Sequence, residues 1–226
     1  MSSIPVTQQQ LNNCLIIFDC DGVLVDSETL ASQAFAEQLQ LAGFDYSIAD
    51  CQNTFTGLSL STCQAMIEHE SKRRLPAGFF ERLQSQTFKR FADGLQAVAG
   101  ITELLTFLQH SGIASCVASS GDHNKMQFTL GHTQLLPYFE TRLFSASDVA
   151  RGKPAPDLFL HAAQQMGYQP NRCIVIEDSL PGIIAAQAAG MISCGYGASV
   201  AGSGTVSFTH MAKLPEILCR FFEHTS

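Results

Sequence analysis

The chain of 226 residues is acidic and only weakly charged, which limits the classes of partner that it can bind. Hydrophobic residues make up 46% of the sequence and charged residues 15%, so the chain can bury a sizeable core and is not intrinsically disordered. A net charge of −7 disfavours a general surface for nucleic acid or an anionic membrane, although it allows a local positive site for an anionic small molecule.

The first predicted element is a buried strand over 14–18 that ends in two acids. Five apolar residues, CLIIF, precede Asp19 and Asp21, and Gly22 follows at once. An apolar run that stops at a turn signal is typical of a strand buried on both faces. An ionised carboxylate beside a core must be paired or coordinated, so these acids indicate a functional site. A turn with a capping acid is the alternative interpretation.

Residues 29–92 are predicted to form an all-helical insertion. A helix is expected over 29–42, with Gly43 as its end. Apolar residues recur at helical spacing over 59–71 and again over 76–91. No convincing strand pattern interrupts these segments, so the insertion is expected to contain helices only.

From Gly94 onward, the pattern alternates between strands and helices. Helices are expected over 101–110, after Asp122, over 156–166, after Ser179 and from Leu214, and strands over 113–118, 142–145, 173–176, 191–194 and 205–208. Nearly all-apolar strands separated by helices predict a doubly wound parallel sheet with both faces covered. The predicted fold is an α/β core, 1–28 and 93–226, with an inserted helical cap domain over 29–92.

Polar side chains follow three of the strong strands, and a lysine stands in a later loop. These residues are Asp19 and Asp21, Ser119 and Ser120, Glu177 and Asp178, and Lys153. Because the carboxyl ends of parallel strands lie along one edge of the sheet, we expect them to converge in one crevice. Each has an ordinary alternative when taken singly, such as a helix cap, a turn residue or a solvated lysine. Their joint position at strand ends favours a site.

Acids, hydroxyls and one lysine in a single crevice suit a divalent cation and a phosphoryl group. Asp19 is the candidate nucleophile, because carboxylates form aspartyl-phosphate intermediates. A hard cation such as Mg²⁺, held by Asp19, Asp178 and Glu177, would offset the repulsion between this carboxylate and a phosphate. Asp21 can act as acid toward the leaving oxygen and then as base toward water. The candidate contacts of the phosphoryl oxygens are Ser119, Ser120 and Lys153.

The cysteines and the amino terminus predict a reduced, cytoplasmic protein. The eight cysteines are scattered without a C-x-x-C pair, so buried thiols are expected rather than a zinc site or a disulfide framework. Residues 1–13 are expected to form a loose tail. They are polar and lack the basic start and apolar stretch of a signal peptide. No apolar run approaches transmembrane length, and no coiled-coil heptads appear. A monomer is expected.

Four motifs resemble those of the haloacid dehalogenase-like (HAD) phosphohydrolases. They are DCDGVLVDS at 19–27, the strand end at Ser119, KPAPD at 153–157 and EDS at 177–179. The resemblance covers nearly the whole chain from about residue 14. It is strongest to the β-phosphoglucomutase-like branch, whose helical cap is inserted between the first and second motifs.

The resemblance implies a role for each site residue. It implies that Asp19 is the nucleophile and Asp21 the acid and base, and that Ser119 and Lys153 bind phosphate. It also implies that Mg²⁺ is held by Asp19, the carbonyl of Asp21, and Asp178, with Glu177 as a helper. The expected substrate is a small-molecule phosphate ester, with no nucleic acid or membrane partner.

Two positions in the helical segment favour a phosphatase over a phosphosugar mutase of this branch. Ala31 stands where the mutases keep a cap histidine, and Leu60 stands where they keep an arginine for the second phosphate. The stretches 121–127 and 208–216 are similar to bacterial 6-phosphogluconate phosphatases, which implies a sugar or sugar-acid phosphate as substrate. A mutase and a non-catalytic phospho-ligand binding module are the alternatives.

Overall fold

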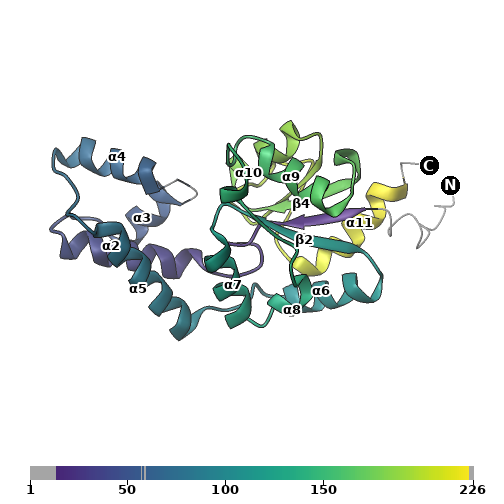
Figure 1. The fold of residues 1–226 in the computed structure, drawn as a ribbon, viewed down its shortest axis with the longest axis horizontal. Coiled ribbons are helices and arrows are strands. Elements are labelled where there is room, and N and C mark those ends of the chain that lie inside the picture. The colour runs from purple at the N-terminus through teal and green to yellow at the C-terminus, as the bar shows by residue number, and fades with distance from the viewer. Residues whose placement is uncertain (1–13, 57, 59, 224–226) are drawn as a thin grey trace. The chain divides into compact units, whose positions relative to one another are not determined.

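The computed structural model describes residues 14–56, 58 and 60–223, and it divides the chain into two compact units (Figure 1). Asp26–Gln96 forms one unit, and the chain before and after it forms the other. The loose tail predicted over 1–13 lies outside the described residues. Among the described residues, no helix is both long enough and apolar enough to cross a membrane.

A six-stranded, all-parallel sheet forms the centre of the larger unit (Figure 1). The strands follow the order β3-β2-β1-β4-β5-β6, with the bounds β1 (Leu15–Phe18), β2 (Ala114–Ser119), β3 (Leu143–Ser145), β4 (Cys173–Glu177), β5 (Ile192–Tyr196) and β6 (Val206–Phe208). All four residues of β1 are fully buried, which explains why this strand reads as a continuous apolar run. The predicted doubly wound parallel sheet is confirmed.

Helices cover both faces of the sheet. On one face, α9 (Asp157–Met166) and α10 (Leu180–Ala188) share a hydrophobic cluster with β1, β2 and β4. The helices α6 (Ile101–His110) and α8 (Leu136–Phe139) lie on the other face (Figure 1), where the ring of Phe139 contacts that of Phe18 at a centroid distance of 6.2 Å. The remaining elements are α7 (His123–His132), α11 (Leu214–Glu223) and short 3₁₀ turns at Ala146–Asp148, Pro170–Arg172 and Met211–Lys213.

The order in which strands are added to the sheet switches sides at β1, although all the strands are parallel. The strands β2 and β3 extend to one side of β1, whereas β4, β5 and β6 extend to the other. In register, Phe18 lies between Val117 of β2 and Ile176 of β4, so these three strands end within about two residues of one another. Open α/β sheets bind ligands outside the carboxyl ends of strands at such a switch point. The polar residues after β1, β2 and β4 occupy this position.

The smaller unit consists of helices around its own core. Its elements are α2 (Glu28–Leu41), α3 (Ile48–Phe55), α4 (Leu60–Ser71) and α5 (Phe79–Gly94), and the described residues of this unit form no strand. Phe35 contacts both Phe55 and Phe79, at centroid distances of 5.1 and 6.1 Å. The predicted helical segment 29–92 falls inside this unit, although α3 was not predicted. That this unit serves as a cap stays a prediction.

Candidate active site

Asp19 and Glu177 stand side by side at the switch point. The backbone N–H of Asp19 donates to the carbonyl of Ile176 at 3.0 Å, which continues the pairing of β1 with β4 by one residue beyond the strand. Glu177 is the last residue of β4, and its side chain is 1% exposed, whereas Asp19 is 6% exposed. Two adjacent strands therefore deliver two buried carboxyl groups to one place.

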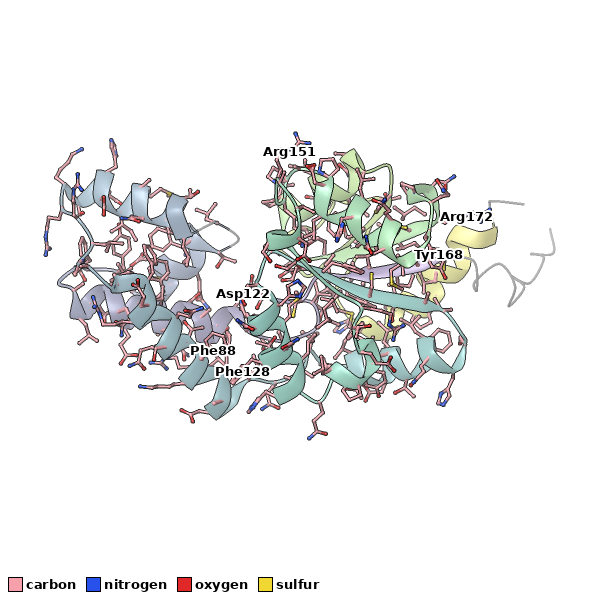
Figure 2. The ribbon with its side chains drawn as sticks, in the orientation of Figure 1. Phe88, Asp122, Phe128, Arg151, Tyr168 and Arg172 are labelled. Atoms are coloured by element: carbon pink, nitrogen blue, oxygen red, sulfur yellow. The ribbon has the colours of Figure 1, made fainter. Side chains whose placement is uncertain are left out.

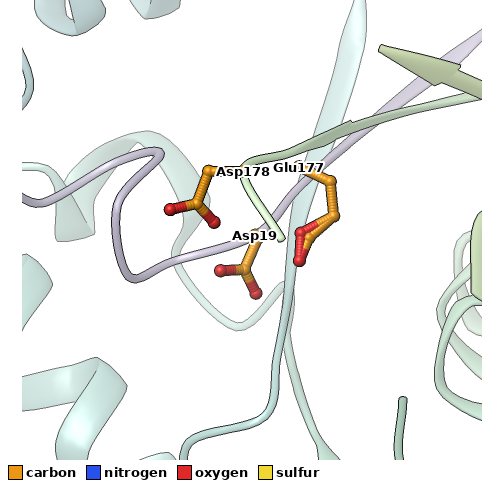
Figure 3. A group of neighbouring side chains, drawn as sticks. All are labelled: Asp19, Glu177 and Asp178. Atoms are coloured by element: carbon orange, nitrogen blue, oxygen red, sulfur yellow. The ribbon is translucent and has the colours of Figure 1, made fainter. Parts of the chain in front are cut away.

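Asp178 completes an acidic group that fits a metal ion. One carboxylate oxygen from each of Asp19, Glu177 and Asp178 lies within 4.8 Å of the others, at the ends of β1 and β4 (Figure 3). Within the described part of the chain, the buried Oε2 of Glu177 has no hydrogen-bond partner. A buried carboxylate oxygen requires a partner, and hard oxygen donors suit Mg²⁺ or Ca²⁺. These residues fit a divalent cation.

Two glycines make room for these carboxylates. A Cβ added at Gly22 would lie 1.9 Å from Oδ2 of Asp178, and one added at Gly182 would lie 2.0 Å from Cδ of Glu177. Gly22 also has φ +75°, a left-handed conformation that residues with a Cβ adopt at a cost. The hydroxyl of Ser179 donates to Oε1 of Glu177 at 2.8 Å and accepts from the backbone N–H of Gly182 at 3.2 Å. The predicted cap of α10 therefore also orients an acid of the site.

We expect Gly22→Ala to weaken both folding and cation binding. Gly167→Ala is the matched control, because Gly167 has φ +78° but nothing within 4 Å of an added Cβ. The control should lose about 1–2 kcal/mol of unfolding free energy from backbone strain. Gly22→Ala should lose more, and its affinity for Mg²⁺, measured by titration calorimetry, should fall because Asp178 must move. Equal Mg²⁺ affinity in the two variants would contradict this role of Gly22.

Lys153 is the buried cation of the site. Its Nζ lies 2.5 Å from Oδ1 of Asp19 and 3.3 Å from Oε1 of Glu177, and it stands 5.0 Å from the ring centroid of Phe159. Burial alone would lower the pKa of Lys153, but the Asp19 and Glu177 carboxylates outweigh it and raise that pKa. Burial raises the pKa of Asp19, with Lys153 opposing and the Glu177 carboxylate adding to the rise.

The two serines at the end of β2 are placed differently from each other. Ser119 is buried, and its Oγ accepts a hydrogen bond of 3.0 Å from the backbone N–H of Gly121. A hydroxyl that accepts one bond can still donate its own proton, and donation to a phosphoryl oxygen by Ser119 stays a prediction. Ser145, at the end of β3, donates to the carbonyl of Gly121 at 2.8 Å and so fixes the same turn. Ser120, the other predicted phosphate contact, is exposed in the bend after β2.

Asp21 is paired with Lys125, a residue that no sequence motif predicts at the site. The Nζ of Lys125, in the first turn of α7, donates to Oδ2 of Asp21 at 2.8 Å. Burial alone would lower the pKa of Lys125, but the Asp21 carboxylate outweighs it and raises that pKa. The two residues are 104 positions apart, so no local motif links them. The sequence does contain one signal of this contact, because Lys125 stands in the first turn of a helix, where acids are usually favoured.

Carboxylates outnumber ammonium groups in this site by two. The acids are Asp19, Asp21, Glu177 and Asp178, and the lysines are Lys125 and Lys153. A phosphate ester would add further negative charge to this excess. A divalent cation would supply the missing positive charge beside the oxygen donors that suit it.

Comparisons with known proteins agree on one family. A family model described as "Hydrolase: haloacid dehalogenase-like hydrolase" matches residues 15–190. The 6-phosphogluconate phosphatase of Escherichia coli (strain K12) is 32% identical over 208 residues, which cover 89% of this chain and 93% of that protein.

Solved structures extend this similarity to the fold. A conserved haloacid dehalogenase-like protein of unknown function from Agrobacterium tumefaciens str. C58 has a TM-score of 0.81 and 32% identity, covering 92% of this chain and 98% of that one. A HAD family hydrolase from Deinococcus radiodurans R1, solved with bound phosphate and sodium, has a TM-score of 0.78 and 28% identity, covering 95% and 99%.

Proposed function

This chain belongs to the haloacid dehalogenase-like hydrolases, and from that premise we propose that it is a Mg²⁺-dependent phosphatase of a small phosphorylated metabolite. The observation that carries the proposal is the position of Asp19. It is buried at the switch point, contacts the Lys153 ammonium, and lies with Glu177 and Asp178 in a group of donors that fits a hard cation. The bound phosphate of the relative from Deinococcus radiodurans supports an oxyanion ligand.

In the proposed first step, a carboxylate oxygen of Asp19 attacks the phosphorus of the ester. An O–P bond to Asp19 forms while the bond from phosphorus to the ester oxygen breaks, and Asp21 gives its proton to that leaving oxygen. Lys153 and Ser119 donate hydrogen bonds to the phosphoryl oxygens as charge builds on them. Mg²⁺ held by Asp19, the carbonyl of Asp21, and the acids after β4 would neutralise further charge on the phosphoryl group.

In the proposed second step, water hydrolyses the aspartyl-phosphate. Asp21, now ionised, takes a proton from the water as its oxygen attacks phosphorus, and the bond from phosphorus to Asp19 breaks. Inorganic phosphate leaves and Asp19 returns to its carboxylate form. Both chemical steps therefore use the same pair of acids, with Asp21 in opposite protonation states.

We propose a sugar or sugar-acid phosphate as substrate, supported by the similarity to 6-phosphogluconate phosphatase. The test is a panel of sugar phosphates and sugar-acid phosphates with Mg²⁺, in which inorganic phosphate and isomerised sugar phosphate are both measured. The phosphatase releases one phosphate for each ester consumed. Accumulation of an isomerised sugar phosphate would identify a mutase instead, and no turnover of any ester, including 4-nitrophenyl phosphate, would leave a binding module.

Removal of divalent cations should abolish phosphate release. Treatment with a chelator is expected to reduce the rate to that of the uncatalysed reaction, because the acids then repel the phosphate group. Excess Mg²⁺ should restore the rate. In the same samples, Mg²⁺ at about 100 times its dissociation constant should raise the unfolding free energy by about 2.7 kcal/mol. Activity unaffected by the chelator, without any stabilisation by Mg²⁺, would contradict the proposed metal site.

A further inference from the structure

Lys125 occupies a position in its helix where a cation costs stability. Asp122 caps α7 (Figure 2), accepting a hydrogen bond of 2.8 Å from the backbone N–H of Lys125, so this lysine is the third residue of the helix. The amino-terminal turn of a helix carries partial positive charge and favours acids, and α7 has no acid within its first turn. A residue that opposes the helix dipole is expected to have a compensating contact elsewhere. Its bond to Asp21 is such a contact.

The surroundings of Lys125 belong to the candidate active site. A Cβ added at Gly121 would lie 3.3 Å from Cδ of Lys125, 3.4 Å from Oγ of Ser119 and 3.9 Å from Oδ2 of Asp21. Thus the lysine stem, the phosphate-contacting serine and the acid border the same small space. The helix backbone here is also held, because Thr129 donates to the carbonyl of Lys125 at 2.9 Å.

The carboxyl group of Asp21 is only partly enclosed by the protein. The side chains of Asp21 and Lys125 are 28% and 31% exposed, so both reach toward solvent at the site. Proton transfer requires the carboxyl group to be held within hydrogen-bond reach of the reacting oxygen, and small displacements are costly in rate. A charge-assisted hydrogen bond to one carboxylate oxygen restricts the rotation of that group.

We propose that Lys125 is the positioning residue for Asp21, holding one oxygen of its carboxyl group while the group transfers protons to the leaving oxygen and from water. Lys125 keeps its own protons and only donates a hydrogen bond. This inference rests on the proposed function, because it requires Asp21 to be the proton-transferring group. It predicts that Lys125 contributes to turnover solely through Asp21.

The test is a double-mutant cycle on the full chain with Mg²⁺ and 4-nitrophenyl phosphate. The variants are Lys125→Met, Asp21→Asn and their combination, because Asn cannot transfer the proton and therefore gains nothing from being positioned. Lys125→Met should lower kcat about tenfold and leave KM within about twofold. The expected loss of kcat is smaller than the 10²- to 10⁴-fold that general acid–base catalysis typically contributes. In the Asp21→Asn background, the same change should lower kcat by less than about twofold.

Two further variants separate positioning from a general structural effect. Lys125→Arg keeps a donor and should recover most of kcat, whereas Gln127→Met, an exposed position on the same helix, should match the parent in kcat. Unfolding scans establish that each protein is folded. If Lys125→Met does not fold, Lys125→Ala, which likewise has no side-chain hydrogen-bond donor, replaces it in the cycle.

The outcomes distinguish this inference from the proposed function. Equal losses of kcat in both backgrounds, a rise in KM alone, or no loss in the parent would overturn the role of Lys125. If Asp21→Asn itself has the parental kcat, or if the parent hydrolyses no phosphate ester, the proposed function has failed instead.

Discussion

Asp19→Asn is expected to lower kcat by at least about 10⁴-fold while the protein stays folded. The amide is nearly the same size as the carboxyl group, but it cannot attack phosphorus to form an aspartyl-phosphate. Loss of a nucleophile is among the largest effects that a single substitution has on an enzyme. The substitution also removes one negative charge from a buried position whose pKa is raised by burial, so the fold should tolerate it.

The measurement is phosphate release together with thermal unfolding, with Glu103→Gln as control. Glu103 is an exposed acid in the first turn of α6, and its amide variant should retain the parental kcat. A second readout is trapping of the intermediate: acid-quenched parent enzyme incubated with a radiolabelled ester should carry acid-stable label, and Asp19→Asn should carry none. An Asp19→Asn protein that turns over at the parental rate would exclude Asp19 as nucleophile.

The sequence predicts the core of this site because the fold itself aligns it. The runs before Asp19 and Glu177 are wholly apolar, and the run before Ser119 has Ser115 as its one polar residue, so each is recognisable as a buried strand without any structure. Parallel pairing then ends the three strands at nearly the same level, with Phe18 between Val117 and Ile176. The order of the strands alone determines which of these residues lie next to each other along the edge of the sheet, without knowledge of their side-chain positions.

Two features that depend on how a helix approaches a strand end were not predicted. The bond between Lys125 and Asp21 spans 104 positions, and it exists because α7 begins beside the turn after β1. The close contact of Gly182 with the Glu177 side chain likewise depends on how tightly the first turn of α10 packs against the end of β4.

Two helices, α8 and α3, were not predicted. The helix α8 has only four residues, too few for apolar periodicity to show. The helix α3 has eight residues and a better signal, the capping box of Ser47 and Asp50, which local sequence does contain.

We expect Lys153→Met to lower the unfolding free energy by about 3–5 kcal/mol without divalent cations, more than any other single substitution considered above. Lys153 is buried between Asp19 and Glu177, and removing it leaves two carboxylates facing each other without a cation. Breaking a buried ion pair at one partner has an effect of this size because the other charge stays buried. Activity should also fall, by about 10²- to 10³-fold, since a donor to the phosphoryl oxygens is lost.

Two comparisons show whether the loss comes from uncompensated buried charge. Denaturant unfolding of Arg151→Met, which breaks the exposed 2.8 Å pair with Asp157, should show a loss of only about 0–1 kcal/mol. The combination of Lys153→Met with Glu177→Gln should be more stable than Lys153→Met alone, because one of the facing charges is gone.

Mg²⁺ connects this prediction to the metal site. A cation bound by Asp19, Glu177 and Asp178 would replace the charge that Lys153 supplied, so Mg²⁺ should stabilise Lys153→Met more than it stabilises the parent protein. A loss no greater than that of Arg151→Met, unchanged by Mg²⁺, would mean that the carboxylates are not held together by opposite charge. The expected pattern instead makes the lysine and the metal two partly interchangeable cations for one acidic cluster.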